Sequence, residues 1–386
     1  MSGNFKLNLG NKDKFMRKGL GIIAVSLAAG CVFMAGCAGC NNKNKNISPL
    51  ASNWYTSTGY RNIQPTFLEG NELYSPEYKE KIVYDVNFKK PAAGNSTYSV
   101  NYENGTYSTE FYAKQFDTEN LVHSDHKGGY EGKKVIAYYY HTEFSAKVTF
   151  KYGSKESDPL VSNIVTDCYF LSVEEELRPL YSKQVVASPS PAALQAASLE
   201  DCYTLYNETY ETYYSYDGNS AISKITDNET NKTREVKQGV GGTSNSLFDV
   251  TSLEIVLRAL IGSSFDQTID LYTPLNAIKT FTLSSPDTSL GKDEKKSIAT
   301  ALSKKGLYAS DEIDEKFGSG LKTTAVSVTV NTTLKGVSQT YWFAKVENKR
   351  NNTGRATLLK ISLPIVFNLG TLEYTLNEVQ STLWDE

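Results

Sequence analysis

The sequence predicts a mainly β protein built on one large, curved antiparallel sheet, an open half-barrel of about a dozen strands that wraps one buried helix. Apolar and polar residues alternate through much of the chain after residue 80, the period of half-buried strands. One such run extends from Ile136 to Tyr152, far beyond the usual strand of about 5–6 residues. Strands do not alternate regularly with helices, so a mainly antiparallel sheet is the economical arrangement.

The first 47 residues predict export and a lipid anchor. A basic segment ending at Lys18 precedes an apolar run that is short for a membrane-spanning helix. Met34-Ala35-Gly36-Cys37 then resembles the lipobox of bacterial lipoproteins, with Met34 where that family usually has Leu. The resemblance implies cleavage after Gly36 and lipidation of Cys37. We therefore expect an extracytoplasmic protein of a bacterial cell envelope, with its membrane partner reached through Cys37.

The predicted signal peptide sets the order of the segments that follow it in the chain. Residues 1–36 form a lipoprotein signal peptide, 37–47 a flexible polar tether and 48–80 an irregular lead-in. Residues 81–386 form a single β half-barrel domain, in which 284–320 is a helical insertion. Without the signal, 35 basic residues face 42 acidic ones, a net charge of −7. This balance argues against nucleic acid as a partner.

The first half of the domain predicts strands in close succession. Period-2 runs begin at Lys81 and at Tyr98, and Asn104-Gly105 is typical of a two-residue hairpin turn. The run from Ile136 to Tyr152 is the clearest strand, and 161–186 predicts two more around an acidic bend. Residues 192–216 are ambiguous: we expect a helix over 192–199 and then a strand that ends in a hairpin, although the tyrosines of 203–213 also fit helical spacing.

The second half contains the helix that the sheet is expected to wrap. Residues 252–261 leave little polar face, and Thr251 with Glu254 fits a capping box. Two short strands are expected over 267–272 and 277–283. The charged, helix-favouring stretch 292–304 belongs to the predicted peripheral insertion. Period 2 then returns in strands near 326–330, 340–346, 359–363 and 372–376.

Three pieces of sequence together resemble a known family. They are Phe170 with Leu177-Arg178-Pro179-Leu180-Tyr181-Ser182, then Phe248-Asp249-Val250-Thr251-Ser252-Leu253, and finally Leu358-Leu359-Lys360-Ile361 through Gly370-Thr371-Leu372. In this order they resemble envelope proteins of the lipoprotein-carrier half-barrel class, particularly its long-chain relatives. The resemblance implies a deeply curved sheet that wraps a helix and holds acyl chains on its concave face. No counterpart of a dedicated receptor loop is evident.

Aromatic side chains are expected on the concave face. A sheet that curls encloses a space, and aromatic walls suit apolar or amphipathic, lipid-like ligands. The candidate ligand-binding residues are Tyr84, Tyr98, Phe111, Tyr138, Tyr140 and Phe144. The alternative is that these side chains fill a solid core around the helix, because small barrels are usually filled by their own side chains. The protein would then be a structural or interaction module that meets other envelope proteins through its outer face.

Cysteine chemistry leaves two states open. Cys37 and Cys40 belong to the anchor and tether, so Cys168 and Cys202 remain either as a possible disulfide or as two free buried thiols. Neither state makes a disulfide framework.

The candidate catalytic and metal-binding residues of this sequence have plainer explanations. His123, His126 and His141 could supply ligands to a divalent metal, but the first two lie in a polar loop and His141 lies on the polar side of its strand. The sequence contains neither a G-x-S-x-G elbow nor an H-E-x-x-H helix. We therefore expect no catalytic residues, no metal and no cofactor, and a protein that is not an enzyme.

Overall fold

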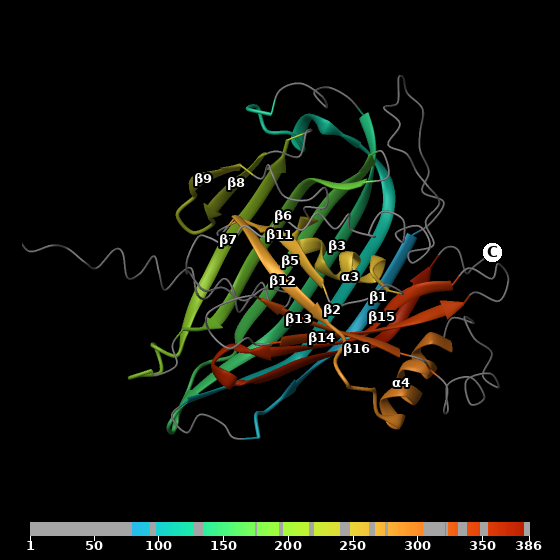
Figure 1. Ribbon diagram of the computed structural model, residues 1–386. Helices are drawn as coiled ribbons and strands as arrows, with labels where there is room; N and C mark the ends of the chain where they lie inside the picture. Colours follow the sequence, from blue (N-terminus) through green and yellow to red (C-terminus); the bar gives the residue numbers. More distant parts are fainter. Residues whose placement is uncertain are drawn as a thin grey trace, which may run out of the picture.

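The computed structural model describes residues 79–92, 98–126, 134–173, 176–192, 196–215, 220–239, 248–261, 267–274, 277–303, 321, 323–330, 338–347 and 354–381. These residues form one open, mixed sheet of 16 strands with few helices (Figure 1). The predicted mainly β class is confirmed. The predicted signal peptide and tether lie outside the described residues, as does the predicted lead-in up to residue 78. Residues 79 and 80, its last two, instead begin the first strand of the sheet.

The sheet follows the chain as a long meander whose ends are β10 and β9. Its order is β10-β11-β12-β13-β14-β15-β16-β1-β2-β3-β5-β6-β7-β8-β9, with β4 paired to β3. All pairs are antiparallel except β10 with β11. The strands are β1 (Lys79–Lys89), β2 (Tyr98–Asp117), β3 (Lys134–Tyr152), β4 (Lys155–Glu156), β5 (Leu160–Val173), β6 (Glu176–Pro191), β7 (Tyr203–Tyr214), β8 (Ser220–Asp227), β9 (Lys232–Gly239), β10 (Phe248–Asp249), β11 (Gln267–Thr273), β12 (Ala277–Ser284), β13 (Thr323–Val330), β14 (Ser338–Glu347), β15 (Gly354–Ile365) and β16 (Gly370–Ser381).

The predicted hairpin at Asn104-Gly105 is wrong. Both residues lie inside the 20-residue strand β2, and the register of β2 against β3 shifts between Glu103 and Thr106. Asn104 has a φ of +52°, so the positive-φ residue makes a bulge that bends a continuous strand. A Cβ on Gly105 would lie 2.7 Å from the Val86 carbonyl oxygen, which explains why the residue after Asn104 is glycine.

The expected helix over 192–199 is also wrong where the chain is described, because residues 197–199 form bends and residue 200 lies in a turn. The strand that follows is confirmed as β7, and its pairing with β8 confirms the hairpin. The strand count exceeds the expected dozen partly because β8 and β9 were not predicted. β9 is almost entirely polar and exposed at one end of the sheet, where charged side chains protect an edge from further pairing.

The central helix is confirmed and is shorter than expected. It comprises a 3₁₀ turn, η3 (Val250–Ser252), followed by α3 (Leu253–Ala259), and it lies on the concave side between β1–β7 and β13–β16 (Figure 1). The capping box is wrong. Asp249 caps the turn by accepting from the Thr251 backbone N–H at 2.8 Å, and the Glu254 side chain points to tyrosines of the sheet.

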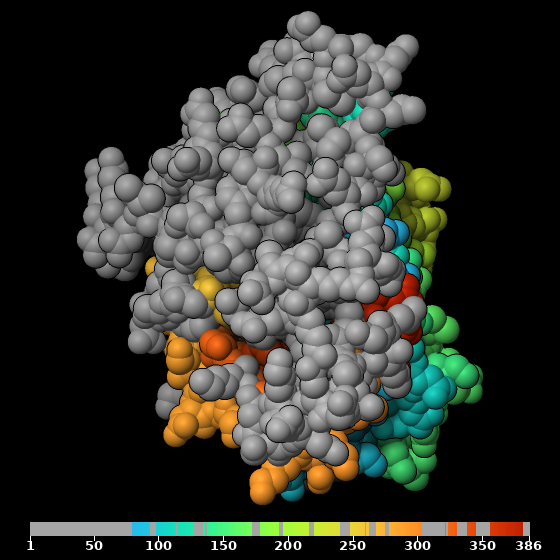
Figure 2. All heavy atoms as spheres, turned by 90° about the vertical axis from the view of Figure 1, so that its right-hand side faces the viewer, coloured from blue at the N-terminus to red at the C-terminus, as the bar shows by residue number. Residues whose placement is uncertain are grey.

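The helix of the predicted insertion is present as α4 (Lys292–Ser303), which packs on β16. Ile298, Ala299 and Leu302 are fully buried in the main hydrophobic core, while the lysines of the helix face outward. This helix is therefore part of the core packing and is not peripheral. Its outer surface lies among the orange atoms in the lower part of Figure 2. In the part of the chain that the structure describes, no helix is long and apolar enough to cross a membrane.

Side chains, in place of backbone pairing, hold the two ends of the sheet near each other. Asp249 at the end of β10 accepts hydrogen bonds from Ser182 of β6 at 2.6 Å and from Tyr214 of β7 at 2.5 Å. Tyr272 of β11 meets Ser223 of β8 at 3.0 Å. Asp249, Ser223 and Tyr272 are fully buried, so these polar contacts close the interior along a line that has no strand ladder.

Candidate functional site

The interior of the sheet is the first candidate, because the predicted ligand-binding residues all point into it. Tyr84, Tyr98, Phe111, Tyr138, Tyr140 and Phe144 are at most 3 % exposed and belong to one core cluster with α3. Their rings pack on one another: the Phe111 centroid lies 6.0 Å from that of Tyr138 and 6.3 Å from that of Tyr140. The structure thus brings the six residues together in the core, each among side chains of the protein itself.

Glu254 of α3 supplies the polar centre of this interior. Tyr107 donates to one carboxylate oxygen at 2.9 Å and Tyr140 donates to the other at 2.5 Å. Burial raises the pKa of Glu254 to about 7, and the two phenol hydrogen bonds oppose that rise. Glu254 is half-buried, whereas both tyrosines are at most 2 % exposed. A carboxyl group that titrates near neutral pH therefore lies at the inner wall of the sheet.

Two further contacts fix this centre. The two terminal nitrogens of Arg258, Nη1 and Nη2, each donate to one oxygen of the Glu80 carboxylate, the second at 2.9 Å, and both side chains are buried. Tyr84 donates to the Leu358 carbonyl oxygen across the interior at 2.9 Å. Tyr374, whose ring lies 5.2 Å from that of Tyr107, is buried, and its hydroxyl has no partner among the described residues.

The bond considered between Cys168 and Cys202 is not formed, and both residues are free buried thiols. Cys168 lies on the inner face of β5 beside Thr251 and Ser252, and burial raises the pKa of its thiol well above the ordinary value. Cys202 precedes β7 and donates to the Ser198 carbonyl oxygen at 3.3 Å. Each thiol therefore contacts side chains or backbone near it and not the other thiol.

The three histidines do not form one group: the ring centroids of His123 and His126 lie 6.1 Å apart, whereas His141 lies among other side chains of the outer face. His123 is buried, with its ring 5.5 Å from that of Tyr213, so the expected exposed loop is wrong at this position. His126 meets Ser220 at 3.1 Å, and His141 lies on β3 between Asp167 and Glu143. Among the residues that the structure describes, no group of His, Cys, Asp and Glu side chains is arranged to hold a metal ion.

The outer face carries a second candidate that the sequence did not reveal. Strand pairing places five tyrosines directly opposite one another on five neighbouring strands, and we name them the tyrosine row. Their ring centroids lie 5.0, 5.0, 5.7 and 5.0 Å apart in order. The row is Tyr112, Tyr139, Tyr169, Tyr181 and Tyr213.

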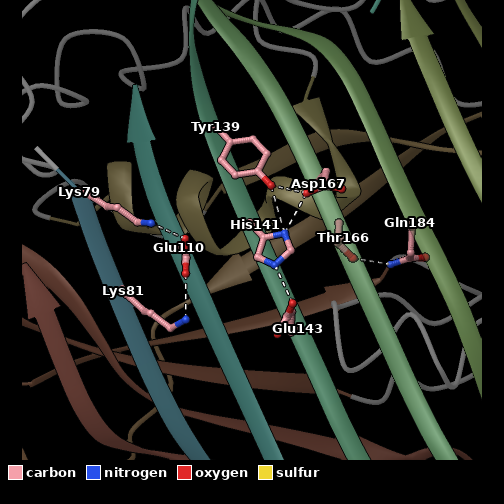
Figure 3. Close-up of polar contacts among 9 residues, drawn as sticks. All are labelled: Lys79, Lys81, Glu110, Tyr139, His141, Glu143, Thr166, Asp167 and Gln184. Atoms are coloured by element: carbon pink, nitrogen blue, oxygen red, sulfur yellow. Dashed lines mark hydrogen bonds and ion pairs between the residues drawn. The ribbon is translucent and has the colours of Figure 1, made fainter. Parts of the chain in front are cut away.

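A charged row runs beside the tyrosine row, two residues along each of these strands. Its members alternate between acceptors and donors across eight strands in register. The row is Lys81, Glu110, His141, Asp167, Lys183, Glu211, Lys224 and Glu235. Figure 3 shows its first half, with Tyr139, His141 and Glu143 along β3 and α3 behind the sheet.

Hydrogen bonds join the two rows. The Tyr139 hydroxyl donates to Asp167 at 2.5 Å, and the Tyr181 hydroxyl donates to Glu211 at 2.8 Å. His141 lies 2.8 Å from Asp167, and this hydrogen bond raises the pKa of the imidazole against the opposing effect of burial. The rings of Tyr139 and Tyr181 are therefore held in position by carboxylates of the charged row, and Figure 3 shows the bond of Tyr139.

Sequence reasoning could have found only part of this outer surface. His141 is expected on the polar side of its strand, which is the side that the structure turns outward, and Tyr139 lies on that same side. The rows themselves depend on the register of seven strand pairs, and no local pattern in one strand specifies that register.

No protein-family model and no curated protein matches this chain. One solved structure is similar, a crystal structure titled as a beta-barrel-like protein of a domain of unknown function, DUF1849, from Brucella abortus. It is 10 % identical, the match covers 80 % of this chain and 99 % of that chain, and the TM-score is 0.40. A similarity at this level carries nothing about function.

Proposed function

We propose that this protein is an interaction module of a bacterial cell envelope, anchored to the membrane by a lipid on Cys37 and acting through the outer face of its sheet. The observation that supports this most is the contrast between the two faces. The inner aromatic residues are packed against one another and against α3, whereas the outer face carries two ordered rows with several half-buried members.

The interior polar groups support a role in binding over one in catalysis. Glu254 accepts two phenol hydroxyls, Asp249 accepts from Ser182 and Tyr214, and Glu80 is paired with Arg258. Each of these carboxyl groups is already bonded to side chains of the helix or of the sheet. Partner recognition on the outer face needs no group from this interior. We accordingly propose a protein that is not an enzyme and needs no cofactor.

Photocrosslinking tests the outer face directly. A benzoylphenylalanine at position 169, in the tyrosine row, should form discrete adducts with envelope components in intact cells. The same residue at position 229, which is exposed in the turn between β8 and β9, serves as the control. Equal adducts at both positions, or none at 169, would contradict the proposed role of this face.

The anchor has its own test. Cys37→Ser should move the protein from the membrane fraction to the soluble fraction, because a thioether-linked lipid cannot form on serine. Cys40→Ser is the matched control and should leave the protein in the membrane fraction. Membrane association of both variants would refute the lipidation of Cys37.

A lipid-like ligand in the interior is the second candidate, in line with the resemblance to half-barrel carriers. It is favoured by the half-buried Glu254 and by the hydroxyl of Tyr374, which has no partner among the residues that the structure describes. These two groups could hold a polar head while the aromatic residues contact its apolar part. Native mass spectrometry of residues 48–386, followed by organic extraction, separates the two candidates. A retained lipid-sized adduct would support the ligand, and a clean protein mass would support the filled core.

A further inference from the structure

The tyrosine row is divided by the chain itself into a covered part and an open part. The segment 121–126 crosses the outer face, where Leu121 packs with Tyr181 and Tyr213 and the His123 ring lies over Tyr213. As a result Tyr181 and Tyr213 are only 6 % and 8 % exposed. The other three members, Tyr112, Tyr139 and Tyr169, are half-buried. They form an aromatic window on β2, β3 and β5.

The ends of the row are taken by lysines. The Lys79 ammonium lies 5.1 Å from the centroid of Tyr112, and the Lys224 ammonium lies 5.3 Å from that of Tyr213. Between them the rings of Tyr139 and Tyr169 form the middle of the row, and Phe116 packs edge-on against Tyr169 at 4.5 Å. The window is therefore a partly apolar floor with Lys79 at one end and the charged row along one side.

The charges of the charged row indicate which chemical class of partner this face can bind. The charged row contains three lysines, four carboxylates and one histidine, so its net charge is −1 with His141 neutral and zero with it protonated. An anionic membrane or a nucleic acid calls for a basic surface, which this is not. A hydroxyl group both donates and accepts hydrogen bonds, so alternating ammonium and carboxylate groups suit a neutral partner rich in hydroxyls.

The strand geometry fits such a partner when it is an extended chain. The rows run across the strands, which are spaced about 4.8 Å apart, a repeat close to the length of one pyranose unit in an extended glycan. The apolar C–H face of a sugar ring packs on an aromatic ring. β2, β3 and β5 are paired on both sides, so an added peptide strand has no free edge to join here.

We propose that the window of Tyr112, Tyr139 and Tyr169, with Glu110, His141 and Asp167 beside it, binds an extended neutral oligosaccharide. Sugar rings stack on Tyr139 and Tyr169, and their hydroxyls bond the carboxylates and the imidazole of the charged row. Figure 3 shows Tyr139 with Glu110, His141 and Asp167 of this site. This inference rests on the proposed interaction function and names the chemical class of the partner. It assigns the hydrogen bond from Tyr139 to Asp167 a second role, which is to hold the Tyr139 ring ready for stacking.

Calorimetric titration of the mature protein with chitohexaose and with cellohexaose tests the inference. The parent should give a saturable isotherm with at least one of them. Tyr169→Ala should weaken binding about tenfold through loss of the stacking ring, and Tyr169→Phe should bind like the parent, because it keeps the ring. Equal affinity of all three proteins would overturn the site, and thermal melting establishes that each variant is folded.

A second measurement covers the case in which Tyr169→Ala does not fold. Tyrosine ring signals of the parent, followed by NMR during the chitohexaose titration, should shift for the outer row and stay unchanged for the buried Tyr84 and Tyr107. Shifts confined to other residues, or binding to zwitterionic vesicles with none to either oligosaccharide, would overturn the glycan assignment. Envelope crosslinks at position 169 that persist in that case would leave the proposed interaction function standing.

Discussion

Replacement of Glu254 by glutamine should make the protein more stable at alkaline pH. The pKa of Glu254 is raised from an ordinary value of 4.5 to about 7 by burial, so the folded protein binds a proton more tightly than the unfolded chain does. Stability from this group is fully present below pH 4.5 and is lost as the pH rises toward and through 7. Glutamine resembles the protonated acid and does not titrate.

The size of the effect follows from that difference in pKa. Each unit is worth about 1.4 kcal/mol, so the carboxylate destabilises the folded state by about 3 kcal/mol above pH 8. Glutamine keeps an oxygen to accept from one phenol and an amide to donate to the other, so Tyr107 and Tyr140 remain paired. At pH 4 the parent and Glu254→Gln should be nearly equally stable.

Urea unfolding followed by circular dichroism at pH 4, 6 and 8 measures this. The difference in unfolding free energy between Glu254→Gln and the parent should grow with pH, and other titrating groups cancel because both proteins share them. Glu229→Gln, at an exposed position, is the control and should follow the parent. A constant difference between Glu254→Gln and the parent across this range would refute the raised pKa.

Three further perturbations test other parts of the structure. Gly105→Ala should cost about 1–3 kcal/mol, seen as a lower urea midpoint, because its Cβ would overlap Val86, and an unchanged midpoint would contradict the bulge geometry. Asp249→Asn should cost about 3 kcal/mol, because an amide cannot accept from all the donors around it; thermal melting equal to the parent would show that this closure contributes little. His141 should titrate above pH 6.5 by NMR, and Asp167→Asn should lower that midpoint; the same midpoint in both proteins would exclude Asp167 as the cause.

The fold class was predictable because most strands alternate inward apolar and outward polar residues. The parity of β3 places Tyr138 and Tyr140 inward and Tyr139 and His141 outward, as the structure has them. The Asn104-Gly105 pair could not be assigned in the same way. A positive φ at Asn104 is compatible with a hairpin turn and with a bulge in a continuous strand. Only the pairing of β2 with β1 and β3 shows that the residue lies in a bulge.

The candidate sites were less predictable, because they depend on contacts between distant parts of the chain. Glu254 has the spacing of a capping residue, yet it bonds two tyrosines that lie more than 100 positions earlier in the sequence. Asp249, close by, takes the capping role. Composition revealed many tyrosines, but their separation into a buried inner group and an outer row depends on strand register, and that becomes visible only in three dimensions.

The pairing of β1 with β16 has a consequence for how the chain folds. Glu80 lies opposite Ser381 in this pair, so the middle of the sheet joins segments about as far apart as the described sequence allows. The strands from β1 to β9 can pair one after another with their neighbours in sequence. One edge of β1, in contrast, stays unpaired until β16 is available, and contacts between segments so far apart in sequence form slowly. If the chain crosses a membrane in sequence order, as its proposed export implies, β1 lacks its partner β16 until the last part of the chain has crossed. We therefore expect chaperones to bind the chain, and proteases to cleave it, mainly between the appearance of β1 and the pairing of β1 with β16.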